Sequence, residues 1–518
     1  MHMIQHKLKF AAAAVLALGL ASCDMNLLPK DGLPTEESLQ TVSDLQNWWN
    51  GRMADLRNQQ GGIFTVVQDL QADQISVTVN QGNHYAGSLS WESCTTSDYD
   101  RRDVYISYYQ ALKNINFVFE NLENLEVKEG EKSTYNILLG RHHFYRAYCY
   151  ANLALRYGTP YNAATAGTDL CVPLLLEFDP VGRPARATNQ EVYNQILNVD
   201  LAKAKELLAG VKGEPGADEI TIDAVTALEA RVKLYMSDWS GALAASKSLI
   251  DGGNYPLVEP DPQNFVDMWV YDAPAEEILM PFISRPKEEP RWANIYYDAK
   301  TDGKRSDNTD GVNYVSYLPF KWVVDMYSDK DLRKPVYFEM QECNIKSNFY
   351  NFYVIAKQKG NPNYASTHND AFTWWGGYVP DGMVRPKIFR MAEQYLIASE
   401  AAFKAGQEGT AKEYLNALRV SRGLDEVTAS GNSLYQAIKD ERTRELAFEG
   451  FRLWDLRRWG EGVKRHDPQV PADGSTSHLR PGIFEYEYQP GDFHFVWPIP
   501  ANDINTNENI KNQQNPGW

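Results

Sequence analysis

The sequence predicts a mainly α-helical protein in which tetratricopeptide-like helix pairs form a scaffold beside an irregular, loop-rich part that carries short strands. Three observations lead to this prediction. Apolar residues recur at intervals of three and four along several segments, which is the period of one helix face. Two of these segments share a two-helix design of about 34 residues. From 256 to 386 the periodicity weakens, and Pro, Gly, Asn, Asp and aromatic residues become frequent.

The first 34 residues are predicted to be a lipoprotein signal peptide and a tether. Lys7 and Lys9 precede an almost wholly apolar stretch, 10–21, which is too short to span a bilayer permanently. Small residues then stand just before Cys23, as a lipoprotein signal peptidase requires. We therefore predict removal of 1–22, a lipid anchor on Cys23 and a polar tether over 23–34. An ordinary signal peptide with an incidental cysteine is the alternative.

Composition narrows the function classes. The 68 acidic residues outnumber the 51 basic residues, for a formal net charge of −17, which disfavours nucleic acid as a partner. No later stretch reaches the roughly 18 unbroken apolar residues of a transmembrane helix. Four further cysteines are widely spaced and are predicted to be buried free thiols, with a disulfide as the alternative. They are Cys94, Cys149, Cys171 and Cys343.

Helix patterns begin in the first third of the chain. Apolar residues on one face predict a helix around 108–122, and a second helix around 144–154 ends at Gly158. A capping-box pattern opens another helix at Thr188. An irregular stretch, 69–100, interrupts these helices.

Two helix pairs follow the same design. The first covers 224–249 and ends at Gly252-Gly253, and the second covers 391–418 with a turn at Gly406. Small residues lie where the two helices of each pair must approach. Such pairs stack because neither can bury its apolar face alone. The loop-rich segment lies between the two pairs, and a short strand is predicted within it at 350–357.

The most distinctive segment runs from Glu441 to Trp459 and reads ERTRELAFEGFRLWDLRRW. Glu441, Glu445 and Glu449 are spaced at one helical turn, and arginines lie among them at distances that permit pairs three or four residues apart. These arginines are Arg442, Arg444 and Arg452. Charges of alternating sign on a helix usually neutralise one another, so we predict a scaffold. An active site built on paired carboxylates is the alternative.

This segment closely resembles the signature of the SusD-like (RagB/SusD) proteins, and so does the ending of the chain, 497–518. The ending here is Pro-Gly-Trp, where the family often has Pro-Gly-Tyr. Further similar positions are Asn116, Arg146-Ala147, Tyr157-Gly158, Glu191-Val192-Tyr193 and the helix from Arg390 to Ala402. The resemblance covers nearly the whole mature chain. It implies an N-terminal helical region over 35–255 and a C-terminal region over 256–518, which includes the loop-rich segment 256–386.

The resemblance implies a binding protein without catalytic activity, cofactor or metal. SusD-like proteins are lipoproteins of the outer membrane of Gram-negative bacteria, and we expect the lipid-anchored chain to face the cell exterior. They capture oligosaccharides, or in some members peptides, and close as a lid over a SusC-like TonB-dependent transporter. The helix pairs would then face the transporter, and the loop side would hold the ligand.

Candidate ligand residues come from the loops, because sugars need aromatic rings for their apolar faces and Asp, Asn or Arg for their hydroxyls. One loop region supplies Asp73, Asn83, Trp91, Asp98 and Tyr99. A second supplies Arg291, Trp292, Asn294, Tyr296 and Tyr297. A third supplies Trp374 and Trp375, for which core packing is the alternative. The resemblance favours the first two regions. Trp91→Ala or Trp292→Ala is therefore expected to weaken binding without unfolding the protein.

Two rival functions remain open. A glycoside hydrolase needs two carboxylates roughly 5–10 Å apart, which 68 acidic residues could supply by chance. The sequence offers no nucleophile elbow, metal cluster or phosphate-binding glycine loop. His142 and His143 are adjacent and so point to different parts of a helix surface. The second rival is a scaffold that uses its helix pairs to bind only a protein.

Overall fold

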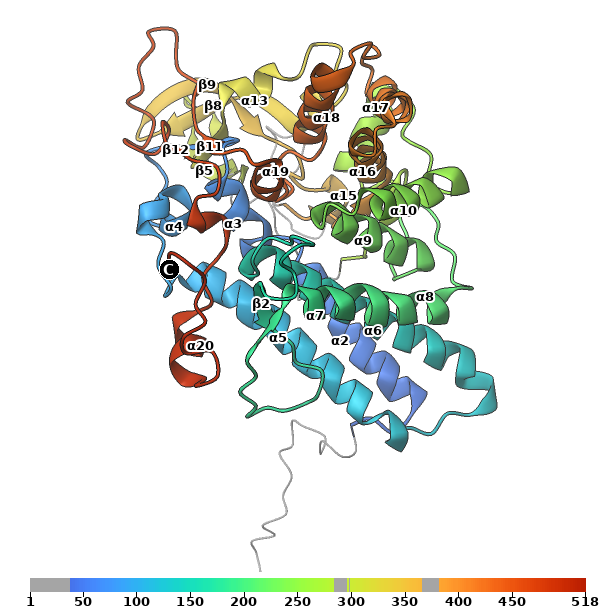
Figure 1. The fold of residues 1–518 in the computed structure, drawn as a ribbon. Coiled ribbons are helices and arrows are strands. Elements are labelled where there is room, and N and C mark those ends of the chain that lie inside the picture. Colours follow the sequence, from blue (N-terminus) through green and yellow to red (C-terminus); the bar gives the residue numbers. More distant parts are fainter. Residues whose placement is uncertain (1–37, 284–295, 298, 366–381) are drawn as a thin grey trace, which may run out of the picture.

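The computed structural model describes residues 38–283, 296–297, 299–365 and 382–518. Helices dominate, and the strands form only small sheets (Figure 1). The predicted mainly α fold is confirmed. Among the described residues, no helix is long and apolar enough to cross a membrane.

The N-terminal helices pack against one another and include the two helices predicted around 108–122 and 144–154. They are α2 (Val42–Asn58), α3 (Ile63–Gln71), α4 (Ala86–Leu89), α5 (Tyr99–Glu120) and α6 (Lys132–Tyr157). The long α6 contacts both α2 and α5. It ends at Gly158, whose backbone is extended, with φ of −83° and ψ of 151°. An added Cβ there would lie 2.7 Å from the carbonyl oxygen of Ala154 and 2.8 Å from Cys171 Sγ. Only glycine fits this close approach.

A small hairpin and a second group of helices cover α6. They are β2 (Leu170–Pro173), β3 (Arg186–Thr188), α7 (Asn189–Asn194), a π-helical turn (Gln195–Leu201) and α8 (Ala202–Leu208). The predicted capping box is confirmed, since the Thr188 hydroxyl accepts from the Glu191 amide. Within the π-helical turn, Asp200 is fully buried and accepts from Arg146. The same carboxylate meets His143 at 2.8 Å.

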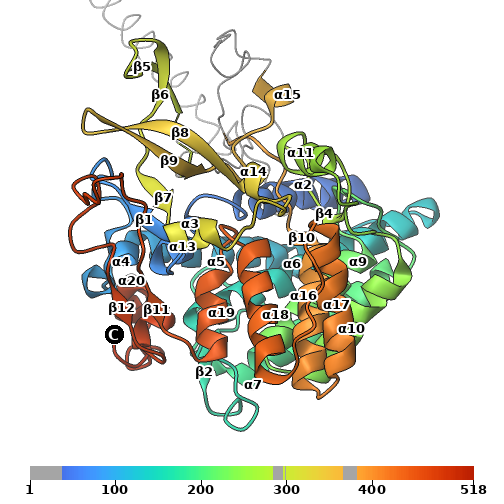
Figure 2. The ribbon, with the colours of Figure 1, turned by 90° about the horizontal axis from the view of Figure 1, so that it is seen from above.

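The two predicted helix pairs are confirmed and lie side by side. The first is α9 (Ile222–Tyr235) with α10 (Trp239–Gly252), and the second is α16 (Met391–Lys404) with α17 (Glu408–Ser421). Gly253 and Gly406 take the left-handed backbone that ends a helix, with φ of 67° and 77°. Because α10 packs on α16, and α16 on α18 (Gly431–Glu445), segments far apart in sequence form one layer (Figure 2).

The loop-rich segment carries short strands, as predicted. Its elements are α11 (Pro262–Val270), β4 (Glu277–Leu279), β5 (Ala299–Lys304), β6 (Asp310–Asn313), β7 (Tyr317–Pro319), α13 (Lys321–Asp325), α14 (Lys334–Tyr337), β8 (Phe338–Ile345), β9 (Asn348–Ile355) and α15 (Pro362–Ala365). The sheet order is β5-β6-β8-β9, and β8 and β9 form an antiparallel hairpin. The strand predicted at 350–357 is β9, shifted by two residues. β7 pairs with β1 (Ile75–Val77), which ties this segment to the N-terminal region.

The C-terminal part returns to the N-terminal helices. Its elements are β10 (Phe389–Arg390), α19 (Arg452–Trp459), β11 (Val463–Lys464), β12 (Glu487–Tyr488) and α20 (Ala501–Thr506). One large apolar core holds Trp49 of α2, Phe144 of α6 and Trp497 of the tail. Arg186 adds polar ties by donating to the carbonyl of Gln513 and the side chain of Asn515. The four described cysteines are buried and free, as predicted.

Candidate functional site

The start of α5 carries the most accessible of the predicted ligand residues. Tyr99 is 54% exposed, and Asn83 is exposed in the loop before α4. Asp98 is partly exposed and caps α5, since its carboxylate accepts from the backbone amide of Arg101 at 3.0 Å. Its second oxygen lies 3.2 Å from the Arg101 guanidinium. An exposed ring beside a carboxylate and an amide is an arrangement that can hold a sugar.

Close packing of α4 on α5 fixes this surface. An added Cβ on Gly87 would lie 2.6 Å from the Asp98 carboxylate, so glycine permits the contact. Tyr85, just before α4, has φ of 58°, a backbone conformation that bulky residues rarely adopt. Burial and neighbouring carboxylates raise the pKa of Asp100 to about 6, and His84 opposes the shift. The loop that holds Asn83 thus lies beside the start of α5.

Two residues of the first predicted region do not reach this surface. Trp91 is 0% exposed, and its ring stacks on Tyr488 at 4.0 Å between centroids. Asp73 is buried and accepts two hydrogen bonds from Arg452, at 2.8 and 2.9 Å. The Trp91 ring and the Asp73 carboxylate are thus both engaged by internal partners. This placement corrects the prediction that they contact a ligand.

The second and third predicted regions lie largely outside the described residues. Those outside are Arg291, Trp292, Asn294, Trp374 and Trp375. Tyr296 and Tyr297 are described, and each is 3% exposed. The Tyr296 hydroxyl donates to Asp69, and the Tyr297 hydroxyl donates to Glu339, both at 2.9 Å. The structure therefore gives these two tyrosines an anchoring role, which corrects their prediction as ligand contacts.

Asp69 joins three distant parts of the chain. Its carboxylate accepts from Tyr296 of the loop-rich segment and, at 3.0 Å, from the backbone amide of Gly450. Burial raises the pKa of Asp69 to about 7. The two hydrogen bonds and the charge of Lys357 oppose this rise, and the charge of Glu449 adds to it. Sequence reasoning missed Asp69, although a lone carboxylate in the apolar run of α3 was a usable signal.

We expect Asp69→Asn to change the pH dependence of stability. The folded-state pKa of Asp69 lies above its unfolded value of 3.8, so its stabilising contribution is full below pH 4 and is lost as pH rises through 7. The asparagine has no such dependence. Relative to the variant, the wild type should lose about 2 kcal/mol of unfolding free energy between pH 5 and 7. Urea unfolding of both proteins at pH 5 and pH 7 measures this difference. An equal change in unfolding free energy in the wild type and the variant would refute the raised pKa of Asp69.

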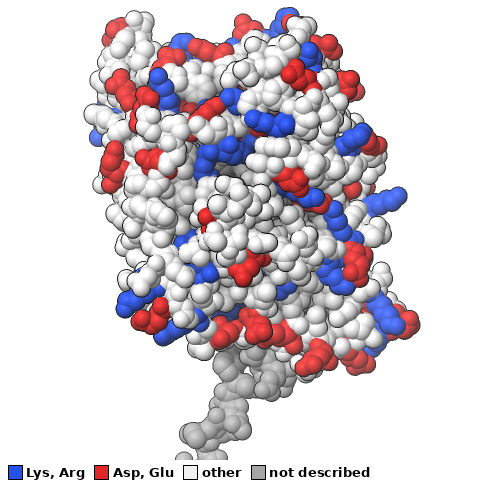
Figure 3. Space-filling view, viewed as in Figure 1, with Lys and Arg blue, Asp and Glu red and all other residues white. Residues whose placement is uncertain are grey.

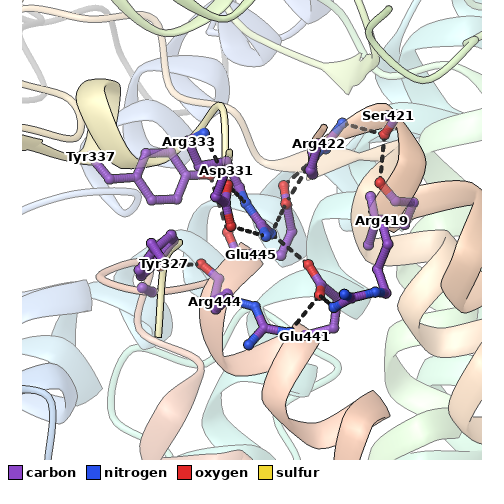
Figure 4. Close-up of polar contacts among 12 residues, drawn as sticks. Tyr327, Asp331, Arg333, Tyr337, Arg419, Ser421, Arg422, Glu441, Arg444 and Glu445 are labelled. Carbon is purple, nitrogen blue, oxygen red and sulfur yellow. Dashed lines mark hydrogen bonds and ion pairs between the residues drawn. The ribbon is translucent and has the colours of Figure 1, made fainter. Parts of the chain in front are cut away.

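The signature segment forms a buried charge network (Figure 4). Glu445 lies within 3.0 Å of Arg333, Arg390 and Arg422. Glu441 contacts three arginines, which are Arg333, Arg419 and Arg444. Both carboxylates are 0% exposed. Burial alone would raise the pKa of Glu441, but its arginine neighbours hold that pKa at about 2.

This network confirms the predicted scaffold and corrects its geometry. α18 ends at Glu445 because Phe448 and Gly450 take left-handed backbone, with φ of 62° and 80°. Glu449 therefore leaves the helix and contacts Lys357 and Arg390. Of the predicted local pairs, Arg444 with Glu441 is observed. The other two arginines reach distant carboxylates: Arg442 contacts Asp455, and Arg452 contacts Asp73.

Comparison with known proteins finds two family models, one over the N-terminal region and one that begins within the loop-rich segment and continues through the C-terminal part. The model described as "SusD family" matches 321–518, and the model described as "Starch-binding associating with outer membrane" matches 35–234. The chain belongs to the SusD family. The signature network and the C-terminal tail lie within the first match, and α2, α5, α6 and α9 lie within the second.

Curated relatives agree with this SusD assignment. A SusD-like protein of Formosa agariphila is 25% identical over 358 residues, which is 62% of this chain and 68% of that protein. The starch-binding protein SusD of Bacteroides thetaiotaomicron is 32% identical over 138 residues, which is 25% of this chain and 21% of that protein.

Solved structures share the SusD fold. A putative sugar binding protein from Bacteroides vulgatus has a TM-score of 0.69 and 22% identity, covering 93% of this chain and 99% of its own. A SusD superfamily protein from Bacteroides thetaiotaomicron also has a TM-score of 0.69 and 22% identity, covering 92% of this chain and 100% of its own. At these identities the likeness shows the fold alone.

The adjacent histidines His142 and His143 of this SusD family member bond internal partners. His142 is fully buried and bonds the carbonyl of Leu138, whereas His143 bonds Asp200. Within the described ranges, no group of three or more His, Cys, Asp or Glu side chains is arranged to hold a metal ion.

Proposed function

We propose that this protein captures oligosaccharides at the outside of the outer membrane and delivers them to a SusC-like TonB-dependent transporter. A lipid on Cys23 would anchor it there. The observation that carries the proposal is the match of two family models, over 35–234 and 321–518, the first being described as starch-binding and outer-membrane associated. The curated relative SusD is itself a starch-binding protein.

The described surface is consistent with sugar capture. Tyr99 offers an exposed ring, and the partly exposed carboxylate of Asp98 and the amide of Asn83 offer hydrogen-bonding groups for hydroxyls. Tyr99 and Asp98 stand at the capped start of α5, and a rigid support lowers the entropy lost on binding. The ligand surface would combine them with the other predicted residues of the loop-rich segment, Tyr296 and Tyr297 excepted.

The proposal includes no catalysis. A glycosidase needs a carboxylic acid that can give a proton to the leaving group. The Glu441 and Glu445 carboxylates of the signature are fully buried, and surrounding arginines hold the pKa of both well below the ordinary value. Incubation with candidate glycans should therefore release no new reducing ends.

A glycan array followed by calorimetry tests the proposal. Tyr99→Ala should weaken binding of the best glycan at least fivefold, because removal of one stacking ring costs about 1 kcal/mol or more. Its thermal unfolding should stay unchanged, since Tyr99 is 54% exposed. Tyr414→Ala, on α17 of the helix-pair layer, is the matched control and should bind normally.

Four outcomes contradict the proposal. Absence of glycan binding on the array removes the proposed ligand class, and binding of peptides alone replaces it. Equal losses in the Tyr99 and Tyr414 variants would remove the assigned surface. The proposed delivery step is contradicted if the protein, purified from detergent-solubilised outer membranes, is recovered without a TonB-dependent transporter.

A further inference from the structure

A polar cavity lies between the helix pairs and the signature segment. α3, α6, α9 and α19 surround it, together with residues 449–451. In Figure 1 these helices meet around the middle of the view, and Lys and Arg side chains gather near the middle of the same face in Figure 3. Its volume is about 110 Å³, several times the roughly 10–15 Å³ that one buried water needs. None of the predicted ligand residues lines it.

The lining combines rings with hydrogen-bonding groups. Phe64, Phe451 and Trp454 supply apolar faces, and Gln60 and Asn152 supply amides. Tyr148 and Tyr235 add hydroxyls. A small molecule with several hydroxyls and an apolar ring face matches this lining.

The charges around the cavity leave a positive excess. Arg231 pairs with Glu393 through two contacts of 2.7 and 2.6 Å, and Lys387 pairs with Asp272 at 2.6 Å. Glu449 is matched by two cations, at 2.7 and 2.6 Å. Arg156 differs, because its hydrogen bonds within the described chain go only to neutral oxygens of Asn152 and Phe64.

Four lining side chains also keep buried polar atoms without a hydrogen-bond partner in the described part of the chain. These atoms are Arg156 Nε, Gln68 Oε1, the Tyr235 hydroxyl and Trp454 Nε1. Gln68 is only 2% exposed, and Arg156 is only 5% exposed. Buried polar groups are nearly always satisfied in native proteins. A polar ligand that draws these side chains toward it would satisfy them.

We propose that this cavity binds a small polyhydroxylated anion, with a uronic acid as the model compound. The carboxylate would lie toward Arg156, the hydroxyls toward Gln60, Asn152 and the tyrosines, and the ring face toward Phe451. This site is separate from the proposed glycan surface at Tyr99 and does not depend on it. It joins a helix pair to the signature segment, so its occupancy would stabilise that junction.

Calorimetry on the full mature chain tests the site with three probes: D-galacturonate, D-galactose and acetate. Galacturonate should bind at least tenfold more tightly than either of the others, because only it carries both the charge and the hydroxyls. Ala151→Phe, which places a ring in the cavity from α6, should weaken galacturonate binding at least tenfold. Ala202→Phe, at an exposed position of α8, is the matched control and should not change it.

A second variant keeps the test decisive if Ala151→Phe does not fold. Gln60→Leu keeps the side-chain size and removes the amide, and it should weaken galacturonate binding several-fold. Tyr99→Ala should leave it unchanged. Galactose binding as tight as galacturonate overturns the anion preference, and acetate binding as tight overturns the role of the hydroxyls. Galacturonate binding that survives both cavity variants, or no binding at all, overturns the site.

Discussion

Glu445→Gln should lower the free energy of unfolding by about 5 kcal/mol, at the upper end of the range for removal of one partner from a buried ion pair. Glu445 lies within 3.0 Å of three arginines. Two of them, Arg333 and Arg422, are 0% exposed. The glutamine keeps the shape and removes the charge, and its amide hydrogens would face arginine donors. The guanidinium groups would stay buried with fewer charges to match them.

Urea unfolding at pH 7 measures the loss. Burial alone would raise the pKa of Glu445, but its three arginine neighbours hold that pKa well below the ordinary value. Its contribution is therefore present at neutral pH and is lost only in acid. Glu206→Gln is the matched control, because its pair with Lys203 is exposed and such pairs contribute about 0–1 kcal/mol. Equal, small losses in both variants would show that the network does not stabilise the fold.

The helix pairs could be predicted from sequence because their information is local. Apolar residues at steps of three and four define one helix face, and Gly253 and Gly406 mark helix ends within a few residues of it. The charge network could be predicted only in part. The signature showed many alternating charges, but the Arg333 partner of Glu445 lies 112 residues away in sequence. No spacing rule finds such a partner.

The ligand surface was harder to predict for the same reason. Trp91 and Tyr296 stand among Asn, Asp and Gly, a composition typical of exposed loops. Their burial depends on Tyr488 and Asp69, which lie 397 and 227 residues away along the chain. In the described part of the chain no ring stacks on Tyr99, which stays exposed. Composition therefore predicted a binding region, whereas tertiary contacts decide which of its side chains can reach a ligand.

Trp91→Ala should lower the free energy of unfolding by about 3–5 kcal/mol, the usual range when a buried aromatic ring is removed. The ring is 0% exposed. It stacks on Tyr488 at 4.0 Å and meets Phe495 edge-on at 5.1 Å. Its indole nitrogen donates to the carbonyl of Gln71 at 3.1 Å. Alanine would leave a cavity, remove the ring contacts with Tyr488 and Phe495, and leave the Gln71 carbonyl unsatisfied.

Trp91→Phe is the matched control, since it keeps a stacking ring and loses only the indole hydrogen bond and part of the volume. In chemical unfolding, Trp91→Phe should lose less than half of the unfolding free energy that Trp91→Ala loses. Both variants should bind glycan normally once folded. Tyr99→Ala should show the reverse, with weaker binding and unchanged stability. If Trp91→Ala instead weakened binding at unchanged stability, the ring would act at the surface, and its stack with Tyr488 would not form in the native protein.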